Sequence, residues 1–181
     1  MTSYTVPYPF WLPLRSGGFS STQIATGAVT TLAVTADILY ACPLFVAQAS
    51  VTLSAIGIEV TTFATGNVRL GIYYDSAGAP VTLLQDSGAV STGTANGFKS
   101  VATSQVLTSG WWWLACVFSA TPTVRVITTA NSLHLLGATS GTDTAIHSGV
   151  SVAQAYGSLP DPFTAESALH TGNFPRIMIQ I

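Results

Sequence analysis

The stretch Gly110-Trp-Trp-Trp-Leu-Ala-Cys-Val-Phe118 decides the fold, because an extended strand of this sequence is apolar on both faces. Successive side chains of a strand point to opposite faces, so Trp111, Trp113 and Val117 share one of them. The other face carries Trp112, Leu114, Cys116 and Phe118. One face serves the core of a layered β fold, and the second must be covered by a loop or by another subunit.

The same two-residue period recurs from about residue 28 onward, and no segment of useful length shows a helical period. Asp75-Ser-Ala-Gly-Ala-Pro80 has the composition of a turn, and Ser109-Gly110 is predicted to turn the chain into the tryptophans. Many short strands at close spacing indicate an all-β fold, an antiparallel β-sandwich with jelly-roll-like winding. The predicted strands cover residues 28–35, 38–47, 51–62, 67–74, 81–84, 87–92, 98–107, 111–119, 123–129, 133–136 and 174–181.

Residues 137–173 depart from this pattern, because they are rich in Gly, Ser, Thr and Ala and show no clear strand. Stretches of that length without strands are uncommon in compact domains and are often functional. Two interpretations stay open, namely irregular packing around Tyr156 and Phe163 or a functional loop.

Charge is scarce in this chain. Charged residues make up 7% of the 181 residues, with 5 Lys+Arg and 7 Asp+Glu, and the mean hydropathy is +0.50. An ordinary soluble domain has about 25% charged residues, and surface charge is what keeps a monomer dispersed. The composition therefore predicts a protein that is buried among copies of itself or in a larger assembly.

The net charge of −2 and the scattered basic residues argue against a nucleic-acid partner, which requires clustered Lys and Arg. The N-terminus lacks the basic and apolar regions of a signal peptide, so synthesis in a cytoplasm is expected. Two long uncharged stretches, residues 38–58 and 100–124, are both interrupted by polar residues, and Pro43 also interrupts the first. Membrane insertion is therefore not expected.

The first 23 residues form a separate unit, which we interpret as an anchoring arm ahead of a single domain at residues 24–181. Pro7, Pro9 and Pro13 exclude a helix and a central strand, yet the aromatic side chains between them favour burial. The arm either wraps back on its own domain or docks on a neighbouring subunit. The predicted anchoring and interface residues are Tyr8, Phe10, Trp11, Leu12 and Leu14, together with Trp112 in the domain.

Residues that could bind a metal do not form a recognisable motif. His134, His147 and His170 show no metal-ligand spacing, and no calcium-binding loop is present. We therefore predict neither a metal nor a cofactor. Cys42 and Cys116 each lie in an apolar strand-like run, and buried free thiols are favoured over a disulfide in a reducing compartment.

Catalytic residues are not predicted either. A glycosidase needs two carboxylates across a cleft, and the sequence cannot place any such pair. Asp75 and Asp161 lie in turn contexts, where Asp binds the backbone, and no GxSxG motif is present. The acids available for a pair are Asp75, Asp86, Asp143, Asp161 and Glu166. Three arginines lie at strand positions, namely Arg69, Arg125 and Arg176. Two interpretations stay open for them: solvation at the surface, or ion pairs with Asp37, Glu59 or Asp86.

Seven segments occur in an order and spacing that resemble a β-sandwich domain of tailed-bacteriophage and gene-transfer-agent-like structural proteins. The resemblance runs from about residue 29 to the end of the chain, and the arm lies outside it. The segments are Gly57-Ile-Glu-Val-Thr-Thr62, Val68-Arg-Leu-Gly-Ile-Tyr-Tyr-Asp75, Leu83-Leu-Gln-Asp-Ser-Gly88, Gly110-Trp-Trp-Trp-Leu-Ala115, Pro122-Thr-Val-Arg125, Leu159-Pro-Asp-Pro-Phe163 and Pro175-Arg-Ile-Met-Ile179.

The resemblance implies a virion structural part, commonly oligomeric, and it implies no catalytic residues. In that family the domain often forms the outer part of a tail fibre or a head spike. A short arm and one domain suit a capsid decoration, a head spike or a small tail-fibre component. We therefore expect a non-enzymatic virion protein, a homo-oligomer with a trimer preferred, attached to other virion proteins by its arm.

Host-surface glycans are the expected recognition target, because aromatic side chains stack on sugar rings and short polar side chains bind the hydroxyls. The predicted glycan contacts are Tyr73, Tyr74 and Tyr156. The alternative is a jelly-roll carbohydrate-binding module that acts as a free lectin. A third class, a polysaccharide-degrading enzyme, requires convergent carboxylates in a groove.

Overall fold

The computed structural model describes residues 19–21, 29–128, 136, 147–165 and 168–181. Most of the anchoring arm lies outside the described residues, including Tyr8, Phe10, Trp11, Leu12 and Leu14. The described part of the chain folds into two antiparallel sheets that pack face to face, so the predicted all-β sandwich is confirmed.

The seven-stranded sheet has the order β1-β13-β4-β9-β12, with β2 also paired to β9 and β7 also paired to β4. Its strands are β1 (Phe19–Ser21), β2 (Val29–Ala33), β4 (Ala55–Thr62), β7 (Gly97–Ala102), β9 (Thr123–Ile127), β12 (Phe174–Pro175) and β13 (Ile177–Gln180). β1 pairs with β13, so three residues that the sequence assigned to the arm belong to the sandwich.

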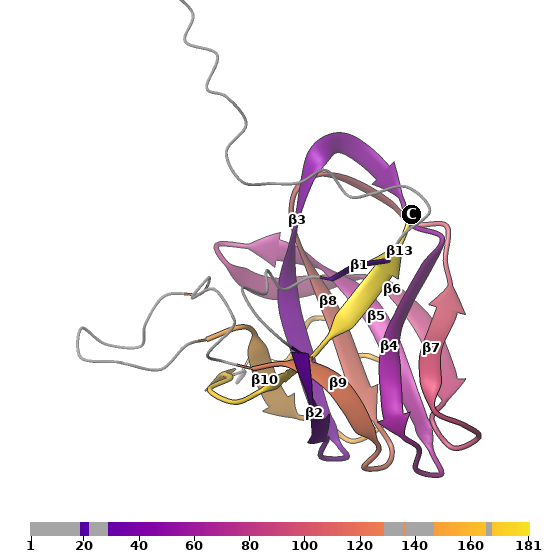
Figure 1. Cartoon of the computed structure of the whole chain (residues 1–181). Helices are drawn as coiled ribbons and strands as arrows, with labels where there is room; N and C mark the ends of the chain where they lie inside the picture. Colours follow the sequence, from indigo (N-terminus) through magenta and orange to yellow (C-terminus); the bar gives the residue numbers. More distant parts are fainter. Residues whose placement is uncertain (1–18, 22–28, 129–135, 137–146, 166–167) are drawn as a thin grey trace, which may run out of the picture.

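The six-stranded sheet has the order β11-β10-β3-β8-β5-β6. Its strands are β3 (Ile38–Thr52), β5 (Asn67–Ser76), β6 (Ala79–Ser91), β8 (Val106–Phe118), β10 (Val150–Ala153) and β11 (Ala168–Leu169). Consecutive strands mostly alternate between the two sheets, which is the winding that jelly rolls use. The two layers can be followed in Figure 1, where β13 crosses in front of β8.

The main core lies between the sheets and includes the inner face of β8, the tryptophan strand, from Trp112 to Phe118. Trp112, Leu114, Cys116 and Phe118 of β8 all belong to it. They pack with residues of the opposite sheet, among them Ile56, Ile58, Val124, Val126, Ile177 and Ile179. The alternation expected from the sequence therefore sets which tryptophans enter this core.

Two predicted turns have different outcomes. The turn at residues 75–80 is confirmed as the link between β5 and β6, where Ala77 and Gly78 both have positive φ, 53° and 81°. The predicted turn at Ser109-Gly110 is wrong, because both residues lie inside β8. Gly110 has φ 138° and lies where the β3–β8 register shifts between Val46 and Ser50, so this glycine marks a bulge.

Other strand boundaries also differ from the prediction. The predicted strand 51–62 is divided at Leu53 and Ser54, where the chain passes from β3 to β4. The predicted strands 81–84 and 87–92 are both parts of β6, which ends one residue earlier, at Ser91, and keeps pairing with β5 through three register shifts. Segment 137–173 contains β10 and β11, which are too short to show a period. The predicted strand 133–136 lies outside the described residues except for Leu136, which is in a bend.

The second face of the tryptophan strand is covered by the same chain. We call residues 154–163 the covering segment; it lies on the outer face of the six-stranded sheet. Leu159 and Phe163 from this segment pack in a second buried cluster with Trp113, Ala115 and Val117. Full burial of a large apolar side chain is worth about 1.5–3 kcal/mol. Of the two alternatives that the sequence left open, the loop is therefore the one that covers this part of the strand.

Three aspartates hold the covering segment on the sheet. The Tyr156 backbone N–H donates to Asp37 Oδ1 at 2.7 Å, and the Leu159 N–H donates to Asp86 Oδ2 at 3.2 Å. In a third contact the covering segment supplies the acceptor, because Asp161 Oδ1 accepts the Leu83 N–H of β6 at 3.1 Å. Since backbone groups bonded to carboxylates make stronger hydrogen bonds than neutral pairs, these contacts fix the segment at both ends and in the middle.

Gly71 of β5 lets the covering segment approach closely. A Cβ atom at this position would meet Leu159 Cδ1 and would lie 2.7 Å from the Gln85 carbonyl oxygen. The carbonyl belongs to the neighbouring strand and cannot move without disturbing the sheet. The absence of a side chain at Gly71 is thus what allows Leu159 to seat on the sheet.

We predict that Gly71→Ala lowers the free energy of unfolding by about 1–3 kcal/mol, the usual cost of overpacking a core. Urea denaturation followed by tryptophan fluorescence measures the change. Gly157→Ala is the matched control in the covering segment, because its nearest neighbour to an added Cβ is the Ala155 oxygen at 3.9 Å. The control should stay within about 1 kcal/mol of the wild type. Equal stability of all three proteins would contradict this account of Gly71.

Candidate functional site

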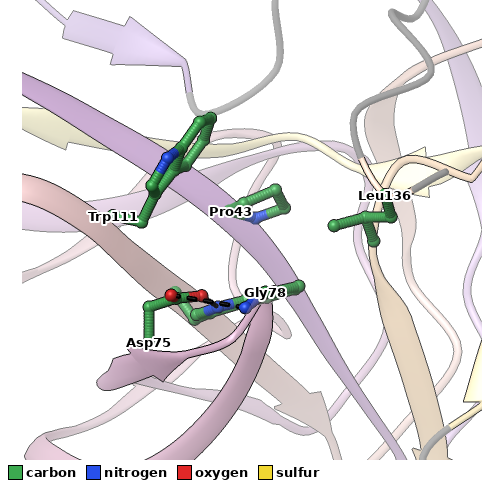
Figure 2. A pocket seen from close by; sticks show the side chains of 6 residues that line it. Pro43, Asp75, Gly78, Trp111 and Leu136 are labelled. Carbon is green, nitrogen blue, oxygen red and sulfur yellow. Dashed lines mark hydrogen bonds between the residues drawn. The ribbon is translucent and has the colours of Figure 1, made fainter.

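A pocket opens on the outer face of the six-stranded sheet, with a volume of about 230 Å³. It is lined by Pro43 of β3, Asp75 of β5, Trp111 and Trp113 of β8, Gly78 of the β5–β6 turn, and Leu136. Figure 2 shows Trp111 and Leu136 on two sides of the pocket, with Pro43 between them and Asp75 beside Gly78. The pocket therefore brings together four segments that are distant in sequence.

The carboxylate of Asp75 is held in a fixed position at this pocket. The Trp113 indole Nε1–H donates to Asp75 Oδ1 at 2.7 Å, and the Gly78 N–H lies 3.4 Å from Oδ2. Trp113 is itself fully buried, so its ring cannot move away. The sequence predicted a turn role for Asp75, and the turn contact with Gly78 is present. The bond to Trp113 could not be predicted, because it depends on the sheet register that sets Tyr73 opposite Trp113.

Trp111 supplies an exposed aromatic surface to the same pocket. Its side chain is 39% exposed, which is high for so large an apolar group. The ring of Phe45, its partner in the β3–β8 register, lies 5.0 Å away at an interplanar angle of 56°. This contact supports the indole from one side. The pocket thus combines a braced aromatic ring with a fixed carboxylate.

Two of the predicted contact residues are buried. Tyr73 has 0% exposure, and its hydroxyl donates to the Pro160 carbonyl at 2.9 Å. Burial raises the pKa of Tyr73, so the phenol keeps its proton. Tyr73 as a glycan contact is therefore wrong, because the covering segment lies over it. Trp112 as an interface residue is also wrong, since it is 8% exposed and belongs to the main core.

The other two tyrosines keep access to solvent but do not join the pocket. Tyr74 is 43% exposed, with its ring centroid 5.1 Å from that of Trp112, and it points to the inner side of the sheet. Tyr156 is half-buried in the covering segment, where burial raises the pKa of its hydroxyl. The three predicted tyrosines therefore do not form one surface.

Each of the five described carboxylates accepts a hydrogen bond from within the chain. Asp86 binds Arg69 Nε at 2.7 Å, and Glu59 binds Arg125 Nη2 at 3.0 Å, so two arginines are paired rather than simply solvated. Arg125 lowers the pKa of Glu59 chiefly through this hydrogen bond. Asp37, Asp75 and Asp161 hold backbone or indole N–H groups. Asp143 and Glu166 lie outside the described residues.

His170 is built into the packing beside β10. Its ring lies edge-on to Tyr40 and Phe174, with centroids 5.6 and 5.5 Å away. Nε2 donates to the Asn173 carbonyl at 3.2 Å, which leaves Nδ1 to accept the Ser151 hydroxyl at 3.0 Å. Burial lowers the pKa of His170, partly offset by the bond to Asn173. This histidine therefore has a structural role in the packing.

The remaining predicted groups are placed as follows. Cys42 and Cys116 are buried free thiols, as predicted, and burial raises the pKa of Cys116 well above its ordinary value. His147 is buried, and His134 lies outside the described residues. Within the described ranges, no three metal-ligating side chains gather in one place. The described residues contain no helix that is long and apolar enough to cross a membrane.

The described residues thus form a β-sandwich with an aromatic–carboxylate pocket on the outer face of the six-stranded sheet. A scan against protein-family models and a search of curated proteins each found no match to the chain.

We predict that the stability of the protein decreases as the pH falls below about 6.5, the ordinary pKa of histidine, toward the lowered pKa of folded His170. In that range the unfolded chain binds a proton that the folded chain does not, so acid favours unfolding. Thermal unfolding between pH 7.5 and 5 measures the effect. His170→Phe keeps the ring packing and should reduce this pH dependence; an unchanged slope would exclude His170 as its cause.

Proposed function

We propose that the protein is a non-enzymatic structural component of a phage-like particle, a capsid decoration, head spike or tail-fibre part. The sandwich serves as a rigid unit that the N-terminal arm attaches to other virion proteins. We also propose a closed homo-oligomer, with a trimer preferred, and a location in the virion after synthesis in a host cytoplasm.

The observation that carries this proposal is that the chain has few charged residues and that its described carboxylates bind groups of the same chain. Charged residues are 7% of the chain, and the five described carboxylates are all engaged in internal contacts. Large apolar side chains are exposed among the described residues, including Phe63 at 54%. A surface with little free charge and scattered apolar groups is typical of a protein that works inside an assembly.

The segments that resemble the phage structural domain support the same proposal. They correspond to framework elements, namely β4, β5, β6, β8, β9, the covering segment and the β12–β13 region. The argument for a trimer from the second face of β8 is weaker than the sequence indicated, because the covering segment already buries Trp113 and Val117. The oligomer is therefore proposed from the composition and the exposed apolar groups.

The alternative, a free jelly-roll lectin, is favoured by one observation, the pocket between Trp111 and Asp75. A free lectin needs no arm and no particle. The two proposals therefore differ in where the protein is found and in what residues 1–18 do.

The test is density-gradient sedimentation of lysates from cells that make the protein naturally, with immunoblotting of each fraction. We expect the full chain to sediment with particles that hold nuclease-resistant DNA. A chain without residues 1–18, which keeps β1, should stay in the soluble fraction. If both chains stay soluble, the virion proposal fails and the lectin is preferred.

A second measurement tests the oligomer. Light scattering of the full chain and of the chain without residues 1–18 should give the same discrete mass above that of an 18.7 kDa monomer. The reason is that the sandwich itself carries the exposed apolar groups that association would bury. Well-behaved monomers in both samples would contradict the homo-oligomer.

A further inference from the structure

We propose that the pocket between Trp111 and Asp75 binds a single neutral pyranose ring, which stacks on the Trp111 indole and donates hydroxyl hydrogen bonds to the Asp75 carboxylate. This inference deepens the proposed function and rests on it only for the source of the sugar, a surface glycan. None of the tyrosines predicted as glycan contacts lines the pocket.

Trp111 has the properties of a stacking surface. Its indole lines the pocket while 39% exposed, and Phe45 supports it at a centroid distance of 5.0 Å. The C–H face of a pyranose is apolar and matches the electron-rich face of an indole. Because the ring is already held by Phe45, little side-chain freedom is lost when a sugar binds.

Asp75 supplies the polar contact at the right place. Trp113 Nε1–H occupies one acceptor position of Oδ1, and Gly78 N–H makes a long contact with Oδ2. A carboxylate has about four acceptor positions, so two sugar hydroxyls can still donate to it. Hydrogen bonds to a charged acceptor are stronger than those between neutral groups. The buried Trp113 keeps the carboxylate aimed in one direction, as a binding site requires.

The size and the lining of the pocket limit what can bind. Its volume of about 230 Å³ is smaller than the roughly 300–1,000 Å³ of pockets for drug-sized ligands, and suits one ring. Pro43 and Leu136 make the remaining walls apolar, and none of the described lysines and arginines lines the pocket. Figure 2 shows these walls around the space between Trp111 and Asp75. An acidic sugar would place its charge against Asp75, so neutral pyranosides are favoured.

Saturation-transfer NMR on the full chain tests the proposal. The probes are methyl α-D-glucopyranoside, methyl β-D-galactopyranoside and methyl β-D-glucuronide. We expect saturable binding of at least one neutral glycoside, with a Kd on the order of millimolar, which particle avidity would strengthen. The glucuronide should bind about tenfold more weakly than the neutral glycoside because of the Asp75 charge.

Four variants locate the site. Trp111→Ala should weaken binding about tenfold or more, and Trp111→Phe should recover part of it by keeping an aromatic face. Asp75→Asn should weaken the neutral glycoside about tenfold and reduce the discrimination against the glucuronide. Phe63→Ala, which removes an exposed aromatic group outside the pocket, should bind as the wild type does.

The proposal is overturned if no neutral glycoside binds saturably at concentrations up to about 50 mM, well above the expected Kd. It is equally overturned if Trp111→Ala and Asp75→Asn both bind like the wild type. Neither result bears on sedimentation with particles. The particle assay with Trp111→Ala therefore separates a failure of the sugar site from a failure of the structural role.

Discussion

The structure depends on one constraint, namely that β8 must be shielded from water on both faces. A strand with a single apolar face needs only the opposite sheet, whereas β8 also buries Trp113, Ala115 and Val117 on the outer side. The covering segment meets this need from within the chain, with Leu159 and Phe163 over the strand. Farther along the same face, at Trp111, the described residues form the pocket.

The few described carboxylates of this chain bind groups within the fold. Asp37, Asp86 and Asp161 bind backbone N–H groups that hold the covering segment or its neighbouring strand. Asp86 also pairs with Arg69, so a single carboxylate joins β5, β6 and the segment. In a partly buried setting such bonds are stronger than surface ion pairs, which are worth about 0–1 kcal/mol. Among the described residues, the carboxylates therefore serve the internal organisation of the fold.

Much of the fold could be predicted from the sequence, because side-chain alternation is a local property. The period of two identified the main strands, and the 75–80 turn followed from its residues. Gly110 was misjudged because glycine marks turns and bulges alike, and only the pairing with β3 separates them. The pocket could not be predicted, since the Trp113–Asp75 bond joins residues 38 positions apart through the register of β5 and β8. Tyr73 was misjudged for a similar reason, because the Pro160 carbonyl that receives its hydroxyl lies 87 positions away.

The irregular pairing of β5 with β6 has a consequence for self-association. β6 is the outermost strand on its side of the six-stranded sheet, and its register shifts three times along β5. Proteins usually guard such an edge with lysines, which discourage the open backbone of one molecule from pairing with another. β6 carries no lysine, and two other features interrupt its open backbone. One is the bulges, and the other is the covering segment, which binds the Leu83 N–H and the Val81 carbonyl. This edge therefore lacks the straight ladder that amyloid-like growth by strand addition requires.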